Sequence, residues 1–415
     1  MSAFDFVATY TMPKNKRPVP RKPTTSPGED DDVMAQALAD LALELAEQEH
    51  AEEEDLAALR MKEDEFNKLL RNALRKKNDE VLYGAIERAR DADVGAYQYV
   101  RSHIEEASAT VLLRKEGGPA MEVSAFAVPL FVHSNGGLKQ AEGFQDGDAF
   151  AELVDSFKQA ALESPHAKVV MISHAYDADE ADRITYSDLN DMARDAAASM
   201  SDKKLVATPA LERSIVGWTP TSFADGDKAV ELRFLLGFAL KRADDPFYQP
   251  PLDEAAADAW FEQRMERYRA WTVQAAPLVR RCLAADPAAL ELHFLYQDLF
   301  FGAREQGMAE LAMLQMMAEL GAALQQHGGT AKAVVGPADV DDMMVLRVSL
   351  LGPDGAQLAS SDKPLDLAAD LQAEVDDICD ALGTLGVDTV SVALRFGKDG
   401  QPQEVQPYTG PGANP

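Results

Sequence analysis

The chain has 415 residues, 46% of them hydrophobic and 27% charged, and a formal charge of -30 at neutral pH. This length suits two or three packed units rather than a single core, and the composition is ordinary for a soluble globular protein. Nucleic acids and anionic membranes are themselves polyanions, so the charge disfavours both as partners.

The cysteines and the absence of targeting signals predict a cytoplasmic protein. Cys282 and Cys379 both fall in apolar helical patterns, whereas a disulfide-stapled secreted protein normally carries more cysteines. The basic residues near the N-terminus follow a short, polar-interrupted stretch, which is the reverse of a secretory signal. No run of about 18 apolar residues occurs that would cross a membrane. We therefore expect two buried free thiols in a reducing cytoplasm.

The N-terminal part of the chain predicts an arm followed by helices. Residues 1–32 combine five prolines with basic residues and end in four acids, which predicts a disordered arm with a basic half and an acidic half. The basic half either docks on an acidic partner or stays solvated. Residues 33–108 carry leucines at helical spacing among many acids and predict an acidic helical segment.

Residues 109–205 predict a first α/β unit, in which a β-hairpin, a helix, a strand and a second helix follow one another. Two strand-like runs around a Gly-Gly-Pro turn indicate the hairpin. The first helix is expected to end at Ser164-Pro165, because proline cannot continue it. Thr185 and Asp188 predict a capping pair for the second helix. The predicted elements are the hairpin 109–132, a helix from Asp148, the strand 168–176 and a helix 185–200.

The same order of elements recurs in residues 206–330 and, in part, in residues 331–397, which indicates an internal repeat. Strand-helix-strand connections favour parallel pairing, so we expect mixed α/β sheets covered by helices. Residues 398–415 are polar and rich in Gly and Pro, and are expected to form a loose tail. The predicted elements of the later units are a hairpin of 214–223 with 228–240, a helix 253–283, a strand 290–301, a helix 303–326, a strand 343–352, a helix from Asp366 and a strand 389–396.

Four apolar segments stand out in the chain: AYQYVRSHIEEASATVLL, MEVSAFAVPLFV, VELRFLLGFAL and RYRAWTVQAAPLV. Together they resemble an uncharacterised bacterial family that is known only by a domain-of-unknown-function label. The resemblance follows the order of elements over residues 66–396 and rests on apolar patterns rather than on catalytic residues. It implies a cytoplasmic protein with no established activity and assigns no functional residue. The acidic arm before Phe66 departs from the family.

The best-equipped position for chemistry is the end of the predicted strand 168–176. His174 there precedes an acidic loop that contains Asp177 and Asp179. Open α/β sheets place ligands beyond the carboxyl ends of strands, and an imidazole beside carboxylates is able to hold a divalent metal or act as a base. The alternative is a solvated acidic loop whose histidine is bonded locally. The chain contains no GxxxxGK[ST], GxGxxG, HExxH or GxSxG motif.

A second candidate pocket contains His133, Asn135 and Tyr176. Paired glycines follow Asn135, and their backbone amides are able to cradle an anion, although a plain turn is the alternative. Adjacent residues of a strand point to opposite faces, so His133 is badly placed to activate Ser134. Convergence of His133, His174 and Asp177 in one concave pocket would favour an enzyme.

Two long helical segments carry residues suited to binding. Trp260, Tyr268 and Trp271 alternate with arginines, which predicts either a basic-aromatic surface or buried rings with solvated arginines. The methionine-rich segment 303–326 either fills a core or lines an adaptable groove.

The leading hypothesis is a non-enzymatic protein-protein interaction or assembly module, which self-associates or binds a protein partner. It is motivated by the absent catalytic motifs and the acidic arm. The alternative is a metal-assisted enzyme or small-molecule-binding protein that uses the acidic loop after His174. The sequence indicates no particular cofactor.

Overall fold

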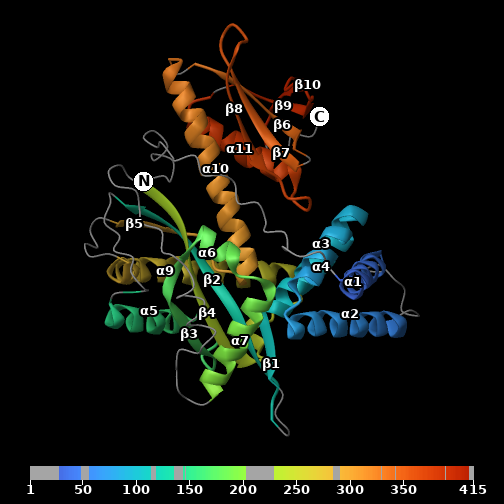
Figure 1. Cartoon of the computed structure of the whole chain (residues 1–415). Coiled ribbons are helices and arrows are strands. Elements are labelled where there is room, and N and C mark those ends of the chain that lie inside the picture. The colour runs from blue at the N-terminus through green and yellow to red at the C-terminus, as the bar shows by residue number, and fades with distance from the viewer. Residues whose placement is uncertain are drawn as a thin grey trace. The chain divides into compact units, whose positions relative to one another are not determined.

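The chain divides into two units, both mixed α/β as predicted, in the computed structural model (Figure 1). The N-terminal unit ends at Gly307 and the C-terminal unit begins at Met308. The structure describes residues 28–47, 56–113, 118–134, 144, 146–201, 229–283, 290–328, 330–341, 343–387 and 389–410.

The acidic segment of the N-terminal unit is helical, as predicted. Helix α1 packs against α3 and α4, and the side chains of Asn78 and Asp93 accept backbone N–H groups at the starts of α3 and α4. The acids at the end of the predicted arm form the first turn of α1, where carboxylates favour the positive end of the helix dipole. The rest of the arm lies outside the described residues. These helices are α1 (Glu29–Glu47), α2 (Leu56–Lys76), α3 (Asp79–Ala92) and α4 (Val94–Ala109).

One antiparallel sheet organises the N-terminal unit, in the strand order β1-β2-β4-β3, with β5 also paired to β2. The hairpin of β1 with β2 is confirmed. The expected parallel pairing is wrong for this sheet, because β4 lies between β2 and β3 and pairs antiparallel to both. The predicted hairpin partner of β4, residues 214–223, lies outside the described residues. The strands are β1 (Thr110–Leu113), β2 (Met121–Ser134), β3 (Lys168–Asp177), β4 (Ala229–Arg242) and β5 (Leu290–Phe294).

This shared sheet joins the segments that the sequence predicts as a first and a second unit. Strand β4 is apolar along most of its length, and both of its edges are hydrogen-bonded to strands of the earlier segment. A strand that is buried on both faces and paired on both edges belongs in the middle of a sheet. The two segments therefore form one structure rather than two successive repeats.

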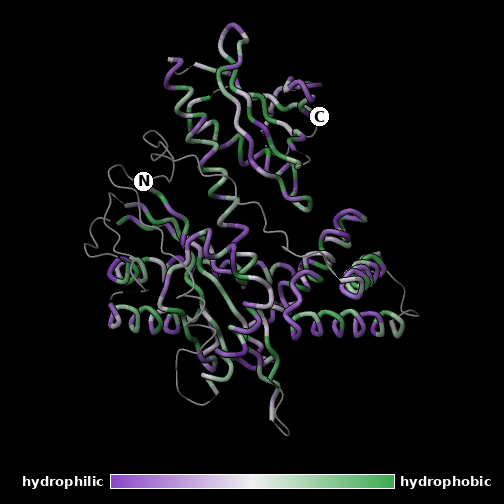
Figure 2. Tube along the Cα trace, viewed as in Figure 1, coloured by the Kyte–Doolittle hydropathy of each residue, from purple (hydrophilic) through white to green (hydrophobic). Residues whose placement is uncertain are grey.

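Helices cover the two faces of this sheet. Alternate residues of β2, including Phe126 and Val128, pack with α5 (Gly147–Gln159) and α9 (Glu254–Leu283), while α7 (Tyr186–Ser201) packs against β2 and α4. Phe126 stacks on Phe157 at 4.9 Å between ring centroids. Gly237 makes room for that stack, since a Cβ atom there would lie 2.3 Å from the Phe126 ring. Figure 2 shows the hydrophobic residues gathered along these strands.

The predicted strand 290–301 is wrong in length, because only its first five residues form a strand. Strand β5 ends at Phe294, and Phe300 and Phe301 begin helix α10 (Phe300–Gln326). Pro129 of β2 explains why the strand ends there. Leu295 donates its N–H to the carbonyl of Pro129, but proline has no N–H and cannot form the second hydrogen bond of the pair. Helix α10 contains residues of both units.

The C-terminal unit is a second sheet in the order β10-β9-β6-β7-β8, in which β6 and β9 are parallel and the other pairs antiparallel. Its main core lies between one face of the sheet, the methionine-rich part of α10, and α11. The predicted helix from Asp366 begins at Leu371, because Asp370 caps it. The elements are β6 (Lys332–Val340), β7 (Met343–Leu351), β8 (Gln357–Pro364), α11 (Leu371–Thr384), β9 (Thr389–Phe396) and β10 (Pro402–Pro407).

The predicted loose tail contains a strand. The chain turns back at Gly397 and Gly400, where Gly400 has a φ of 75°, and β10 then pairs with β9. Glycine adopts this left-handed conformation at little cost, so the turn permits a hairpin that the polar composition conceals.

Candidate functional site

The carboxyl end of β3 runs directly into a short helix, α6 (Ala178–Arg183). Asp177 is the N-cap of this helix and accepts the N–H of Glu180 at 2.8 Å, while the Glu180 carboxylate accepts the N–H of Asp177 at 2.9 Å. This reciprocal pair is a capping box, which bonds two backbone donors at the helix start. The acidic stretch after β3 is therefore a structured helix start rather than a loop.

His174 belongs to the same cluster. Its Nε2 lies 2.9 Å from Oε2 of Glu180, and both side chains are almost completely buried, at 3% and 2% exposure. The same carboxylate oxygen also accepts the backbone N–H of Asp177, so it links the imidazole to the start of the helix. The ring of Tyr176 lies edge-on to the imidazole at 4.9 Å between centroids. The candidate base thus has a carboxylate partner within the protein.

Arg233 of β4 supplies the positive charge of the cluster and is 1% exposed. Its guanidinium donates to the Glu231 carboxylate at 2.5 Å and to the carbonyl of Ala175 at 3.2 Å, and lies 4.0 Å from the Asp177 carboxylate. Burial raises the pKa of the Glu231 carboxyl, the guanidinium opposes this shift, and the carboxylates of Asp177 and Glu180 add to it. The buried cation is thus paired with the carboxyl groups of Glu231 and Asp177.

The three predicted metal ligands do not form a metal centre. His174 and Asp177 are buried in the capping cluster, whereas Asp179 is exposed on α6. Within the described ranges, no group of three or more histidine, cysteine or acidic side chains is arranged to hold a metal ion. The requirements of the helix start explain this, because the cap directs Asp177 and Glu180 toward backbone N–H groups.

The predicted pocket does not assemble either. His133 lies opposite Val230 of β4 and Tyr176 lies opposite Phe234, so four residues along the sheet and one intervening strand separate them. These spacings place their Cα atoms about 16 Å apart. Asn135 lies outside the described residues. His133, His174 and Asp177 therefore do not converge in one pocket.

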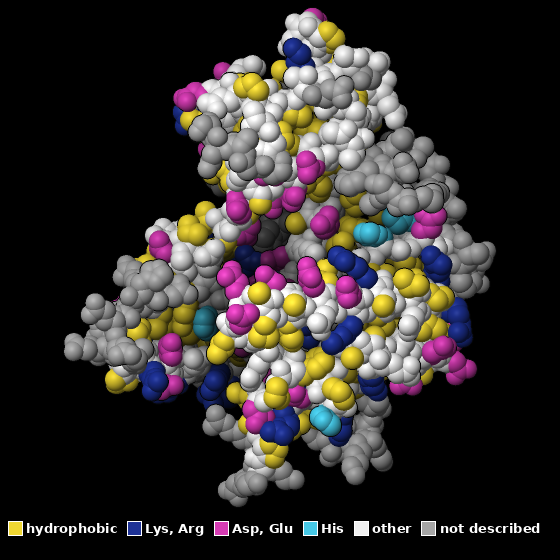
Figure 3. Space-filling view, turned by 180° about the vertical axis from the view of Figure 1, so that it is seen from behind, with side chains coloured by type: hydrophobic (Ala, Val, Ile, Leu, Met, Phe, Trp, Pro, Cys, Tyr) yellow, Lys and Arg dark blue, Asp and Glu magenta, His cyan; other side chains and the backbone are white. Residues whose placement is uncertain are grey.

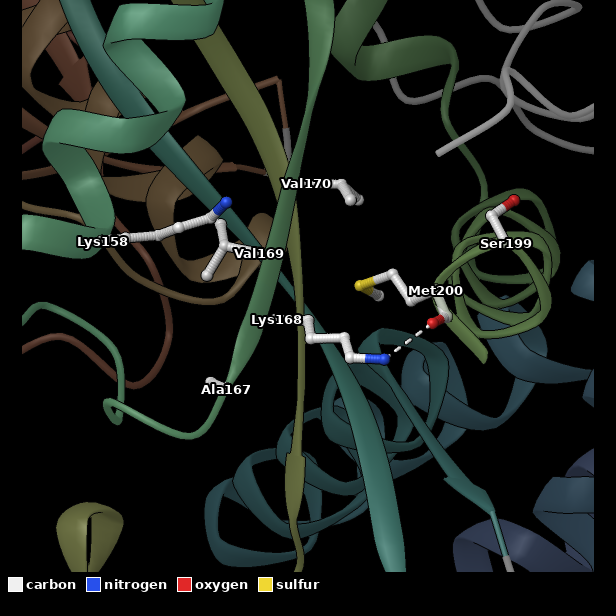
Figure 4. Close-up of a pocket in the computed structure, with 7 residues that line it drawn as sticks. All are labelled: Lys158, Ala167, Lys168, Val169, Val170, Ser199 and Met200. Carbon is white, nitrogen blue, oxygen red and sulfur yellow. Dashed lines mark hydrogen bonds between the residues drawn. The ribbon is translucent and has the colours of Figure 1, made fainter. Parts of the chain in front are cut away.

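The amino end of β3 lies beside a groove that is not predictable from the sequence. A cavity of about 400 Å³ is lined by β3, by Lys158 of α5 and by Ser199 and Met200 of α7 (Figure 4). Lys168 donates its ammonium to the Met200 carbonyl at 3.0 Å. Local signals could not reveal the groove, because it depends on β3 being the last strand of the sheet.

Helix α9 is longer than the surface on which it packs. Tyr268 and Trp271 are buried, so two of the three predicted aromatic residues belong to the core. None of the residues Glu254–Arg267, all described, is buried. Phe261 is 54% exposed, and the Arg264 guanidinium lies over the half-buried Trp260 ring at 5.0 Å. The aromatic stripe therefore continues past the core into a partly exposed half.

No known protein-family model matches the chain, and no curated protein or solved structure is similar to it. The resemblance to an uncharacterised bacterial family therefore stays a prediction. Among the described helices, none combines the length and apolar character needed to cross a membrane.

Proposed function

We infer that this chain is a non-enzymatic assembly module, which pairs with a second copy of itself through the exposed half of α9. The observation that carries this proposal is the continuation of one helix face. At 100° per residue, Ala257, Trp260 and Phe261 share a face with the buried Tyr268 and Trp271. Amphipathic helices bury such a face, but in this half of it Ala257 and Trp260 are only half-buried and Phe261 is exposed.

Charges beside the stripe favour a second copy as the occupant. By the same helical geometry, Asp258 lies beyond the Phe261 edge of the stripe, Arg267 lies at its Trp260 edge, and Arg264 lies within it. When two such helices pack side by side and parallel about a two-fold axis, the acidic side of each meets the basic side of the other. Antiparallel pairing would instead bring like-charged sides together, so the charges favour the parallel arrangement.

The expected association is weak, because a stable dimer buries about 800 Å² on each partner and a few side chains supply less. Sedimentation velocity from about 1 to about 100 μM should show a concentration-dependent dimer. Trp260→Ala with Phe261→Ala should abolish it. Val273→Ala is the matched control, since Val273 is 76% exposed on the opposite side of the same helix.

A charge exchange tests the parallel arrangement. Arg267→Glu should weaken the dimer, and addition of Asp258→Arg should restore it, because each changed side chain again meets an opposite charge across the two-fold axis. A monomer at every concentration, or equal dimerisation by the double-alanine variant, would remove the basis of the proposal.

A further inference from the structure

We propose that the outer edge of β3 is a docking site for an extended acidic segment of another protein, which joins the sheet as an additional strand. This site is separate from α9 and does not rest on self-association. It is defined by Lys158, Lys168, Val169, Val170 and Met200, which line the cavity of about 400 Å³.

The backbone of β3 supplies the first part of the argument. β3 ends the strand order, and among the described strands it pairs only with β4. Along Lys168–Met171 the pairing with β4 is regular, before the register shifts toward Ala175. In a regular edge strand, alternate residues direct their N–H and C=O groups away from the sheet. These groups are the template that an added strand recognises.

The flanks of the edge supply the second part. Figure 4 looks onto β3, with Lys158 and Val169 on one side of the strand and Val170, Lys168 and Met200 on the other. Helices α5 and α7 thus border the edge from the two faces of the sheet, and the cavity lies between them. An extended peptide fits this shape because its side chains alternate between the two faces.

Charge decides which peptide is favoured. Acidic side chains are spread over the face seen in Figure 3, and the chain as a whole carries -30. The charged residues lining this cavity are nevertheless both lysines. Lys158 is 40% exposed and has a loose contact of 3.7 Å to Asp155, and Lys168 uses one of its three donors on the Met200 carbonyl.

The positions of the two lysines specify a pattern. They lie on opposite sides of β3, so two adjacent acidic residues of an added strand would reach one lysine each. Val169, Val170 and Met200 offer apolar contacts to the neighbouring residues of the peptide. The favoured ligand is therefore a short β-prone segment with an adjacent acidic pair between apolar residues.

Fluorescence anisotropy of a labelled, end-capped peptide with the core Val-Glu-Asp-Val tests the site on the full chain. We expect saturable binding, with affinity reduced about tenfold or more by Lys158→Glu with Lys168→Glu, because both favourable charge contacts become repulsive. The matched control is Lys398→Glu, an exposed lysine in the turn before β10, which should change affinity less than about twofold.

A second probe separates strand addition from simple charge attraction. The same peptide with backbone N-methyl groups on alternate residues keeps its charge but loses donors, so it should bind at least about tenfold more weakly in one of the two methylation registers. The proposal would be overturned if both methylated peptides bound as tightly as the unmethylated peptide. It would also be overturned if the double-glutamate variant bound the peptide as tightly as the wild type.

Melting temperatures of the variants keep the outcome interpretable. Both lysines line an open groove, so charge reversal should leave the fold intact. Lys158→Glu alone keeps the Lys168 bond to α7 and should still weaken binding. Failure of α9-dependent dimerisation leaves this peptide assay unaffected, so the two proposals can fail independently.

Discussion

The two ends of β3 differ in their side chains and in their access to a ligand. One end holds buried ionisable groups that are bonded within the protein, and the other lies beside a cavity. The carboxyl end carries His174, Asp177 and the neighbouring Arg233, which are residue types from which active sites are built. His174 is bonded to Glu180, however, and Asp177 pairs with Arg233 and caps α6. The cavity at the amino end is lined instead by two lysines, Lys168 of β3 and Lys158 of α5, together with Ser199 and apolar side chains. The closed end supports the fold, and the open end is where a ligand can make new bonds. One hydrogen-bond acceptor at the closed end is unsatisfied, because Oε1 of Glu180 is buried without a hydrogen-bond partner among the described residues.

Removing the buried cation should have the largest effect. Arg233→Met leaves the carboxyls of Glu231 and Asp177 without their cation, and breaking a buried ionic network of this kind costs about 3–5 kcal/mol of unfolding free energy. Urea unfolding at neutral pH measures the loss. Arg242→Met is the control, because Arg242 is exposed on the same strand and pairs with the exposed Asp244. It should leave the unfolding midpoint nearly unchanged. Equal losses in both variants would refute a structural role for the cluster.

The capping box should show the next largest effect. Asp177→Ala removes an acceptor from the first turn of α6 and is expected to cost about 1–2 kcal/mol, whereas Asp177→Asn retains a capping oxygen and should cost less. The comparison at the open end is Lys168→Met, which removes one bond from an exposed amine and should cost less than about 1 kcal/mol. A larger loss at Lys168 than at Asp177 would reverse the contrast between the ends.

The closed end was partly predictable. The run 168–176 is recognisable as a buried strand, and the pair Thr185 and Asp188 is confirmed as a reciprocal cap. Asp177 and Glu180 have the same three-residue spacing, so a local signal for the capping box was present and points to structure rather than metal binding. Arg233, 56 positions beyond Asp177, could not be placed beside it because only strand order brings them together.

The open end was not predictable, for the same reason. Nothing in the residues around Lys168 states that β3 ends the sheet, and the insertion of β4 between β2 and β3 depends on contacts distant in sequence. The repeat pattern predicts separate units for residues 109–205 and 206–330, whereas β4 of the later segment lies between two strands of the earlier one. Hydrophobic periodicity identifies strands and helices well, but it carries little information about which edges remain exposed.

The smallest expected effect is a pH dependence at the closed end, carried by Glu231. Burial raises the pKa of this carboxyl in the folded protein. A carboxyl whose pKa is raised in the folded protein binds its proton more tightly there than in the unfolded chain. Its contribution to stability is therefore fully present below the pKa of the unfolded state and is lost as the pH rises through the pKa of the folded state. The unfolding free energy should therefore fall across this window toward neutral pH, and Glu231→Gln should make that fall shallower. Burial also raises the pKa values of Glu105 and Glu163, so part of the slope should persist.

Glu231→Gln also weakens the contact with Arg233 and should lower stability at every pH, so the informative quantity is the slope rather than the midpoint. Val230→Ala is the matched control, because it removes apolar contacts beside Glu231 without changing a charge, and it should shift the whole curve with its slope intact. Urea unfolding from mildly acidic to neutral pH distinguishes the change of slope in Glu231→Gln from the uniform shift in Val230→Ala. An unchanged slope in Glu231→Gln would mean that the proton affinity of this carboxyl is the same in the folded and unfolded chains. The buried cluster would then be stabilised by its hydrogen bonds alone, and the difference between the two ends of β3 would lie in bonding geometry rather than in charge.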